Sequence, residues 1–178
     1  KSHASGVWGE DAKDNDYDYK CLRIADFDYD NLGHKEVETI RSIEQKDLKK
    51  ILKNNMILIE KSGGGENQPV GRAILYHSKE KMICANFIEA IVVTDEINSE
   101  FLVYLLSAAY EAKINTKAIK QNTGIQNLDT KYYFNEQIPV PELNEQKKTV
   151  EMLSELTRIV FQTIGKINQS VDYLIEYK

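Results

Sequence analysis

Long apolar runs are missing from this chain of 178 residues, and none approaches the length of a membrane span. No secretory signal peptide is visible either, so we expect a cytoplasmic protein without membrane contact. The two cysteines, Cys21 and Cys84, are too far apart for a zinc or redox motif, and we interpret them as buried thiols. The histidines, His3, His34 and His77, are isolated from one another and from cysteine, which excludes a zinc site.

Catalytic and nucleotide-binding motifs are absent as well. The run Gly63–Gly64–Gly65 invites a phosphate-binding interpretation, but no Gly-Lys-Ser/Thr follows it and it does not lead into a helix. A flexible hairpin loop explains it better. There is no dinucleotide fingerprint, no Gly-x-Ser-x-Gly turn and no Asn-Pro-Pro-aromatic element. The sequence therefore predicts no catalytic residues, no metal site and no cofactor bound by this chain.

The composition permits a soluble domain with a core, since 42% of the residues are hydrophobic and 29% are charged. The length suits one domain with an appendage. The net charge of −5 argues mildly against nucleic acid, which is bound through cationic contacts to phosphate. The charges are uneven, however, because aspartates crowd residues 11–30 and lysines gather in residues 113–131. An acidic chain can still present a basic face.

A heptad pattern organises the last fifth of the chain and predicts one long helix, about 50 Å in length. Pro139 and Pro141 forbid an earlier start, and Asn144 is expected as the N-cap. A stripe of that length exceeds what the preceding domain can cover, so part of it should pair with another helix. The alternative is a terminal helix packed on its own domain. The expected pairing positions are Val150, Leu153, Val160, Ile164, Ile167, Val171 and Leu174.

The preceding region mixes strands with helices and lacks regular βαβ alternation, which predicts the α+β class. We expect two parts, a globular domain over residues 1–141 and a helix over residues 142–178. Residues 113–137 are polar and basic, and we expect them to be irregular. The expected strands cover residues 19–24, 56–61, 70–76 and 81–93, and the expected short helices cover residues 44–54 and 98–112.

The basic stretch is the best candidate for a binding surface, although an ordinary solvated loop has the same composition. Its lysines can neutralise phosphates, and its amide and hydroxyl side chains are of the types that contact base edges in the major groove. A weaker second candidate is Arg72, His77 and Lys79. The aromatic run 132–134 either stacks on bases or belongs to the core. The candidates in the basic stretch are Lys113, Lys117, Lys120, Gln121, Asn122, Thr123, Gly124 and Gln126.

The segment "TGIQNLDTKYYFNEQIPVPELNEQ", followed by the heptad helix, resembles a known junction. It is similar to the junction of a target recognition domain and a conserved spacer helix in the specificity subunit of type I restriction-modification enzymes. Upstream, "GVWGED", "LRIADFD", "ILIEKSGGGENQPVGR" and "CANFIEAIVV" agree with that family in order, so the resemblance covers nearly the whole chain.

The resemblance implies a non-catalytic role in restriction and DNA methylation. The domain would read one half of a bipartite site in double-stranded DNA. The helix would pair with a second spacer helix, set the half-site spacing and help to dock methyltransferase (modification) subunits. S-adenosylmethionine, ATP and Mg would serve the partner subunits, not this chain.

The sequence departs from the family in the count of its parts, because a complete specificity subunit carries two such domains and two helices. We expect either half of a longer subunit or a half-sized protein that pairs with itself. The first residue is Lys rather than Met and no helix stop follows Lys178, which favours the first option. A different class of function, a coiled-coil protein-interaction module without direct DNA readout, also fits the acidic balance.

Overall fold

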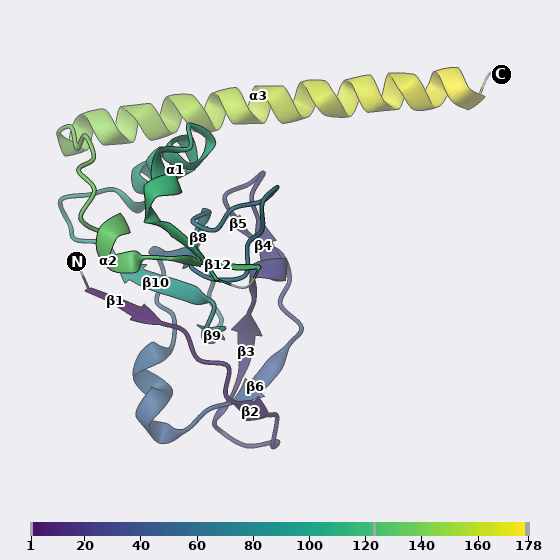
Figure 1. Cartoon of the computed structure of the whole chain (residues 1–178). Helices are drawn as coiled ribbons and strands as arrows, with labels where there is room; N and C mark the ends of the chain where they lie inside the picture. The colour runs from purple at the N-terminus through teal and green to yellow at the C-terminus, as the bar shows by residue number, and fades with distance from the viewer. Residues whose placement is uncertain (1, 123, 177–178) are drawn as a thin grey trace. The chain divides into compact units, whose positions relative to one another are not determined.

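The computed structural model describes residues 2–122 and 124–176. It divides the chain into two units, Lys1–Pro139 and Val140–Lys178, whereas the sequence suggested a boundary after Pro141. Mixed sheets and short helices form the first unit, and one long helix forms most of the second (Figure 1). The expected α+β class is confirmed.

A four-stranded antiparallel sheet lies in the first unit (Figure 1), and two of its strands, β7 (Met56–Glu60) and β8 (Ala73–Tyr76), contribute to apolar clusters on both faces. Ile57 and Ile59 belong to one apolar cluster with Leu102, while Leu58 and Ile74 belong to a second cluster. Burial on both faces explains why the third strand of this sheet reads as a continuous apolar run rather than alternating. In sheet order the strands are β1 (Ser2–Ser5), β10 (Ile88–Val92), β7 (Met56–Glu60) and β8 (Ala73–Tyr76).

A second four-stranded sheet contains one parallel pair, β3 with β9. Both cysteines lie in this pair as buried free thiols. Burial raises the pKa of Cys21 to about 11 and that of Cys84 to about 12, so both thiols are neutral at physiological pH. The strands in order are β2 (Glu10–Asp11), β6 (Ile40–Ser42), β3 (Asp18–Leu22) and β9 (Met82–Cys84); a 3-10 turn, η1 (Ile24–Asp26), precedes the small pair β4 (Phe27–Asp28) and β5 (Gly33–His34).

The helix expected near residues 98–112 is present as α1 (Ser99–Glu111). Asn98 caps it, since its side-chain oxygen accepts a hydrogen bond of 2.9 Å from the Phe101 amide. The helix expected over residues 44–54 is instead a 3-10 turn, η2 (Gln45–Lys50). The reason is tertiary: the Leu52 amide donates to the Met82 carbonyl at 2.8 Å, which draws the chain out of a helical path.

The basic stretch is not irregular, so that expectation was wrong. A 3-10 turn, η3 (Ile114–Ala118), leads into the antiparallel pair β11 (Ile119–Asn122) and β12 (Ile125–Leu128), which a short helix, α2 (Thr130–Tyr133), follows. Gln121 lies opposite Gln126 in this ribbon. Its polar composition hid the strands, because their stability comes from a neighbouring segment: the Leu128 amide donates to the Lys61 carbonyl at 2.8 Å.

The second unit contains α3 (Leu143–Glu176). Asn144 is not its N-cap, because the helix already includes that residue. The Glu142 carbonyl accepts the first helical bonds, from the Glu145 and Gln146 amides, and the Gln146 side chain donates to the Pro141 carbonyl. None of the helices among the described residues is long and apolar enough to cross a membrane.

Candidate nucleic-acid interface

The lysines of the basic stretch differ in how available they are. Lys113 and Lys117 are exposed around η3. Lys120 is also exposed, but its Nζ lies 2.5 Å from Asp129 Oδ2. The hydrogen bond from Lys120 lowers the pKa of Asp129, so this carboxylate stays charged and competes with any phosphate for Lys120. Two of the three expected phosphate contacts therefore remain unopposed by this acid.

The amide side chains of Gln121 and Gln126 lie on the same face of the ribbon, because the two residues are directly opposite each other, but they differ in exposure. Gln121 on β11 is exposed, as a base-contacting residue must be. Gln126 on β12 is only 7% exposed, and its Oε1 accepts a hydrogen bond of 3.3 Å from the Val70 amide. In this conformation Gln126 holds the neighbouring loop and is not available to a base edge, because that loop packs against Gln126 and buries its side chain. Gln126 is therefore a correction to the expected set.

The other expected residues lie at the ribbon's turn. Asn122 ends β11, and Gly124 forms the turn with φ of +86°, a conformation that favours glycine. Thr123 lies outside the described residues.

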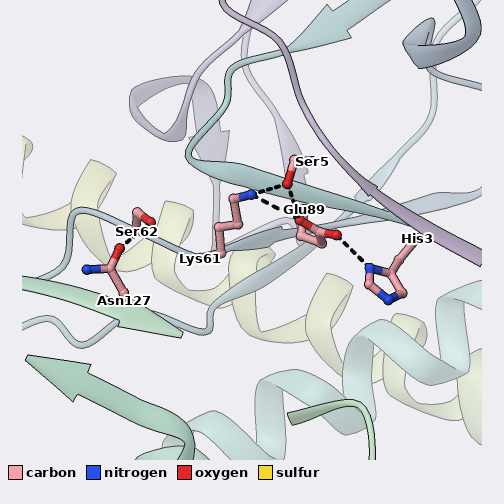
Figure 2. A network of polar contacts seen from close by, with 6 residues as sticks. All are labelled: His3, Ser5, Lys61, Ser62, Glu89 and Asn127. Carbon is pink, nitrogen blue, oxygen red and sulfur yellow. Dashed lines mark hydrogen bonds and ion pairs between the residues drawn. The ribbon is translucent and has the colours of Figure 1, made fainter. Parts of the chain in front are cut away.

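The glycine loop, residues 61–72, holds the β11–β12 ribbon in place. The loop connects β7 to β8 as expected for a hairpin connection, and its first residues run along β12. Ser62 Oγ donates to Asn127 Oδ1 at 2.7 Å (Figure 2), and the Gly63 amide donates to the Gln126 carbonyl at 3.1 Å. Gly64 is required by close packing, because a Cβ there would lie 2.6 Å from the Val70 nitrogen. The loop and the ribbon therefore form one hydrogen-bonded unit.

The buried carboxylate of Glu89 binds Lys61, the first residue of the glycine loop. Glu89 on β10 accepts from His3 Nδ1 at 2.6 Å, from Ser5 Oγ at 2.9 Å and from Lys61 Nζ at 3.1 Å (Figure 2). Burial alone would raise the pKa of Glu89, but the bonds from His3, Ser5 and Lys61 together lower it. The network joins the first strand to Lys61, the residue that precedes the Ser62–Asn127 contact.

A cleft of about 550 Å³ opens beside η3 and brings together residues from distant segments. Lys113 lines it, and so does Arg72, whose guanidinium lies 3.6 Å from the centroid of the Tyr29 ring. Arg72 Nε also lies 3.3 Å from Glu60 Oε2, a carboxylate whose side chain is 4% exposed. Burial raises the pKa of Glu60, and the Arg72 charge opposes that shift. Gln68, on the glycine loop, lines the same cleft.

The second sequence candidate does not form one site. Arg72 precedes β8 and His77 follows it, so the two residues are at opposite ends of a strand. Five residue steps along a strand span roughly 16 Å. His77 and Lys79 are exposed at the end away from the glycine loop, whereas Arg72 joins Lys113 at the cleft. Spacing in sequence could not reveal this separation without the strand boundaries.

The aromatic run after the ribbon belongs mostly to the interior. Tyr133 is 6% exposed, and the Phe134 ring packs on His3 with centroids 4.6 Å apart. Tyr132 is 43% exposed. Among the described residues, no group of three or more His, Cys, Asp or Glu side chains is arranged to hold a metal ion.

The apolar stripe of α3 is largely open to solvent. Val150 is buried and Leu153 is half-buried, whereas the remaining expected pairing positions are between 46% and 71% exposed. These exposed positions are Val160, Ile164, Ile167, Val171 and Leu174. Flanking Leu156 and Ile159 are exposed as well, at 52% and 46%. An exposed apolar stripe of this kind is typical of an interaction surface.

Sequence reasoning missed Gln68, Tyr29 and Glu60 as neighbours of the candidate surface. They come from three separate segments, and each resembles an ordinary loop or strand residue in isolation. Only the paired strands β7 and β8 bring Glu60 next to Arg72, and only the turn of the glycine loop brings Gln68 back toward the same side chain.

The comparisons with known proteins cover both the globular unit and the long helix. The family model described as type I restriction modification DNA specificity domain matches residues 8–173. No curated protein sequence matches the chain.

Two solved structures share the fold. One, reported as the "structural basis underlying complex assembly and conformational transition of the type I R-M system", has a TM-score of 0.60 at 20% identity, with 88% of this chain and 36% of that chain covered. The other is the HsdS subunit from Thermoanaerobacter tengcongensis, with a TM-score of 0.52 at 19% identity, covering 90% of this chain and 36% of that chain. This chain thus spans about a third of the length of each. The match to the family model extends over most of the sequence, and the chain belongs to the family of type I restriction-modification DNA specificity domains.

Proposed function

We propose that this chain reads one half of a bipartite target in double-stranded DNA for a type I restriction-modification enzyme, acting in the cytoplasm. The observation that carries the proposal is the β11–β12 ribbon with exposed Lys113 and Lys117 at its base and exposed Gln121 on its first strand. A two-stranded ribbon has the dimensions to enter a major groove, where amide side chains contact base edges. The lysines would then lie near phosphates and fix the position of the ribbon.

The anchoring of the ribbon supports a reading role over passive charge. Sequence readout requires donors and acceptors that are held in fixed positions relative to the base edges. Here the ribbon is hydrogen-bonded to the glycine loop through Ser62 and Gly63, and Lys61 in turn binds buried Glu89. A solvated loop of the same composition would lack these supports.

The long helix would provide the spacing between two such readers. Its partner would be a second spacer helix, either from the same full-length subunit or from a homodimer mate, and the pair would also contact methyltransferase subunits. If Val150 is the first position of a heptad, no charged residue occupies the flanking positions of the stripe, so two like helices can pair without repulsion there. Those flanking residues are Thr149, Ser154, Leu156, Phe161, Thr163, Asn168, Ser170 and Ile175.

The chain would act without chemistry of its own. Methylation with S-adenosylmethionine, and ATP- and Mg-dependent DNA translocation and cleavage, would belong to the partner subunits. Its contribution would be specificity, because two readers joined by a rigid spacer bind tightly only where both half-sites fit. One reader alone should bind duplex DNA weakly, with half of the base contacts.

A salt titration tests DNA binding directly. Joint replacement Lys113→Ala with Lys117→Ala should weaken binding to every duplex sequence and flatten the plot of log affinity against log salt by about two units of slope. The matched control is Lys49→Ala with Lys53→Ala, which removes the same charge from exposed positions around η2. Equal effects of the two pairs would refute this surface as the DNA contact.

The exposed apolar stripe also fits a second function, a coiled-coil protein-interaction module without direct DNA readout. The net charge of −5 agrees with it. Binding of the wild-type chain to a random duplex at low salt separates the two functions, because only the first one requires such binding.

A further inference from the structure

The side chain of Gln68 is held in one orientation by Arg72. Its Oε1 accepts hydrogen bonds from both terminal nitrogens of the guanidinium, Nη1 at 2.5 Å and Nη2 at 3.0 Å, and only this orientation matches donors with acceptors. The amide oxygen has two lone pairs, and both are used by Arg72. The amide nitrogen lies on the other side of the group and therefore points away from Arg72. Gln68 is exposed, so this nitrogen offers donors to an incoming ligand.

Arg72 is itself held by Glu60 and Tyr29. Its Nε contacts the buried carboxylate of Glu60 at 3.3 Å, and its flat face lies over the Tyr29 ring at 3.6 Å. A guanidinium held by an acid on one edge and a ring on one face has little freedom to turn. The chain of contacts runs from Glu60 through Arg72 to the Gln68 amide.

The backbone around Gln68 is equally constrained. Its amide and carbonyl both bond Gly65, at 3.2 and 3.0 Å, which closes a tight turn over Glu66 and Asn67. The loop that contains this turn is bonded to the β11–β12 ribbon and to α1, where Tyr110 Oη donates to the Pro69 carbonyl at 2.9 Å. Gln68 therefore has a fixed position relative to the ribbon.

We infer that Gln68 is a specificity-determining residue that offers hydrogen-bond donors only, and that it selects guanine. This inference rests on the proposed function of DNA reading. Guanine presents two adjacent acceptors, O6 and N7, in the major groove, whereas thymine presents one acceptor beside a methyl group, cytosine a donor, and adenine a donor beside an acceptor. A free glutamine pairs with adenine through its oxygen and nitrogen together, but here Arg72 occupies the oxygen.

The test is selection of bound duplexes from a randomised library by the full chain at low salt, followed by sequencing. The wild-type chain should enrich guanine at one position. Gln68→Ala should reduce that enrichment about tenfold while the retention of random duplex stays nearly unchanged. Gln68→Glu, whose carboxylate would be held by Arg72 and offers only acceptors, should change the preference to cytosine at that position. Gln45→Ala, an exposed glutamine on η2, is the matched control and should leave the enriched sequence as it is.

Arg72 acts as a positioning residue, and a double-mutant comparison tests that role. Arg72→Met frees the Gln68 oxygen, so adenine should become accepted at the same position. In the Gln68→Ala background, Arg72→Met should add no further change at that position, because its effect passes through the amide. Arg72→Lys keeps a cation beside Glu60 but lacks the two-pronged donor, and it should broaden the preference in the same direction. If Arg72→Met does not fold, the exposed Gln68 variants decide the matter alone.

The outcomes separate the inference from the function on which it rests. A wild-type chain that retains no duplex overturns the proposed function and the inference together. Retention of duplex with an enriched sequence that Gln68→Ala and Gln68→Glu leave unchanged overturns the inference alone.

Discussion

Lys120 Nζ lies 2.5 Å from Asp129 Oδ2. Lys120 belongs to β11, the strand that carries the proposed base contact Gln121. Asp129 also caps α2, since its other oxygen accepts a bond of 3.0 Å from the Tyr132 amide. A carboxylate thus stands beside one of the three lysines expected to contact phosphate. Asp129 partly neutralises the positive charge of Lys120, and it also caps the helix α2 that follows.

Replacement of this acid should strengthen DNA binding. Asp129→Asn keeps a cap oxygen for α2 but releases Lys120, so affinity for any duplex should rise about two- to fivefold at low salt. The gain should shrink as salt increases, because the interaction with phosphate is electrostatic. Asp95→Asn, at an exposed position elsewhere in the first unit, makes the same change in net charge. An equal gain from both variants would mean that net charge alone is responsible.

Close packing of the glycine loop gives a prediction about stability. A Cβ at position 64 would lie 2.6 Å from the Val70 nitrogen and 2.8 Å from the Gln68 carbonyl oxygen, both backbone atoms. Gly64→Ala should therefore lower the free energy of unfolding by about 1–3 kcal/mol. Gly65→Ala is the control, because a Cβ there meets nothing within 4 Å. Urea unfolding measures both, and equal midpoints for the two variants would contradict the described packing.

The Glu89 network predicts how stability depends on pH. The folded-state pKa of Glu89 lies below its ordinary value, so folding favours the charged form. Its stabilising contribution is complete above the unfolded pKa of about 4.3 and is lost as the pH falls through the lower folded value. Glu89→Gln should cost about 1–3 kcal/mol at neutral pH, and this deficit should narrow in acid.

Unfolding curves measured across this pH range check the expectation. Glu38→Gln, an exposed position, should run parallel to the wild type. A constant difference between Glu89→Gln and the wild type from neutral pH down to acid would show that the charge of Glu89 contributes nothing.

The exposed stripe of α3 predicts self-association of this chain. Ile164 and Ile167 are 46% and 56% exposed on the stripe, and their joint replacement by Glu should weaken dimerisation at least about tenfold. Gln162→Glu with Gln169→Glu adds the same charge to exposed positions of the same helix and serves as the control. Sedimentation equilibrium distinguishes the two variants. A wild-type chain that stays monomeric at concentrations where proteins of this size are routinely studied would contradict homotypic pairing.

Sequence by itself determined the local features of this protein. Apolar spacing identified α1, the heptad identified α3, and the resemblance identified the family that the comparison confirms. These patterns depend on residues that are close together in the sequence, so they can be recognised without the structure. The tertiary structure decided the arrangement of the candidate surface. Polar β11 and β12 pair because the glycine loop runs beside them, and the same loop buries Gln126.

Tertiary structure also separates Arg72 from His77, at opposite ends of β8, and brings Arg72 into contact with Gln68. Each of these relationships joins segments far apart in the chain, through strand pairing and burial that no local pattern records. The position of a side chain on a folded surface depends on which distant backbone satisfies its neighbours' hydrogen bonds, and only the three-dimensional structure supplies that information.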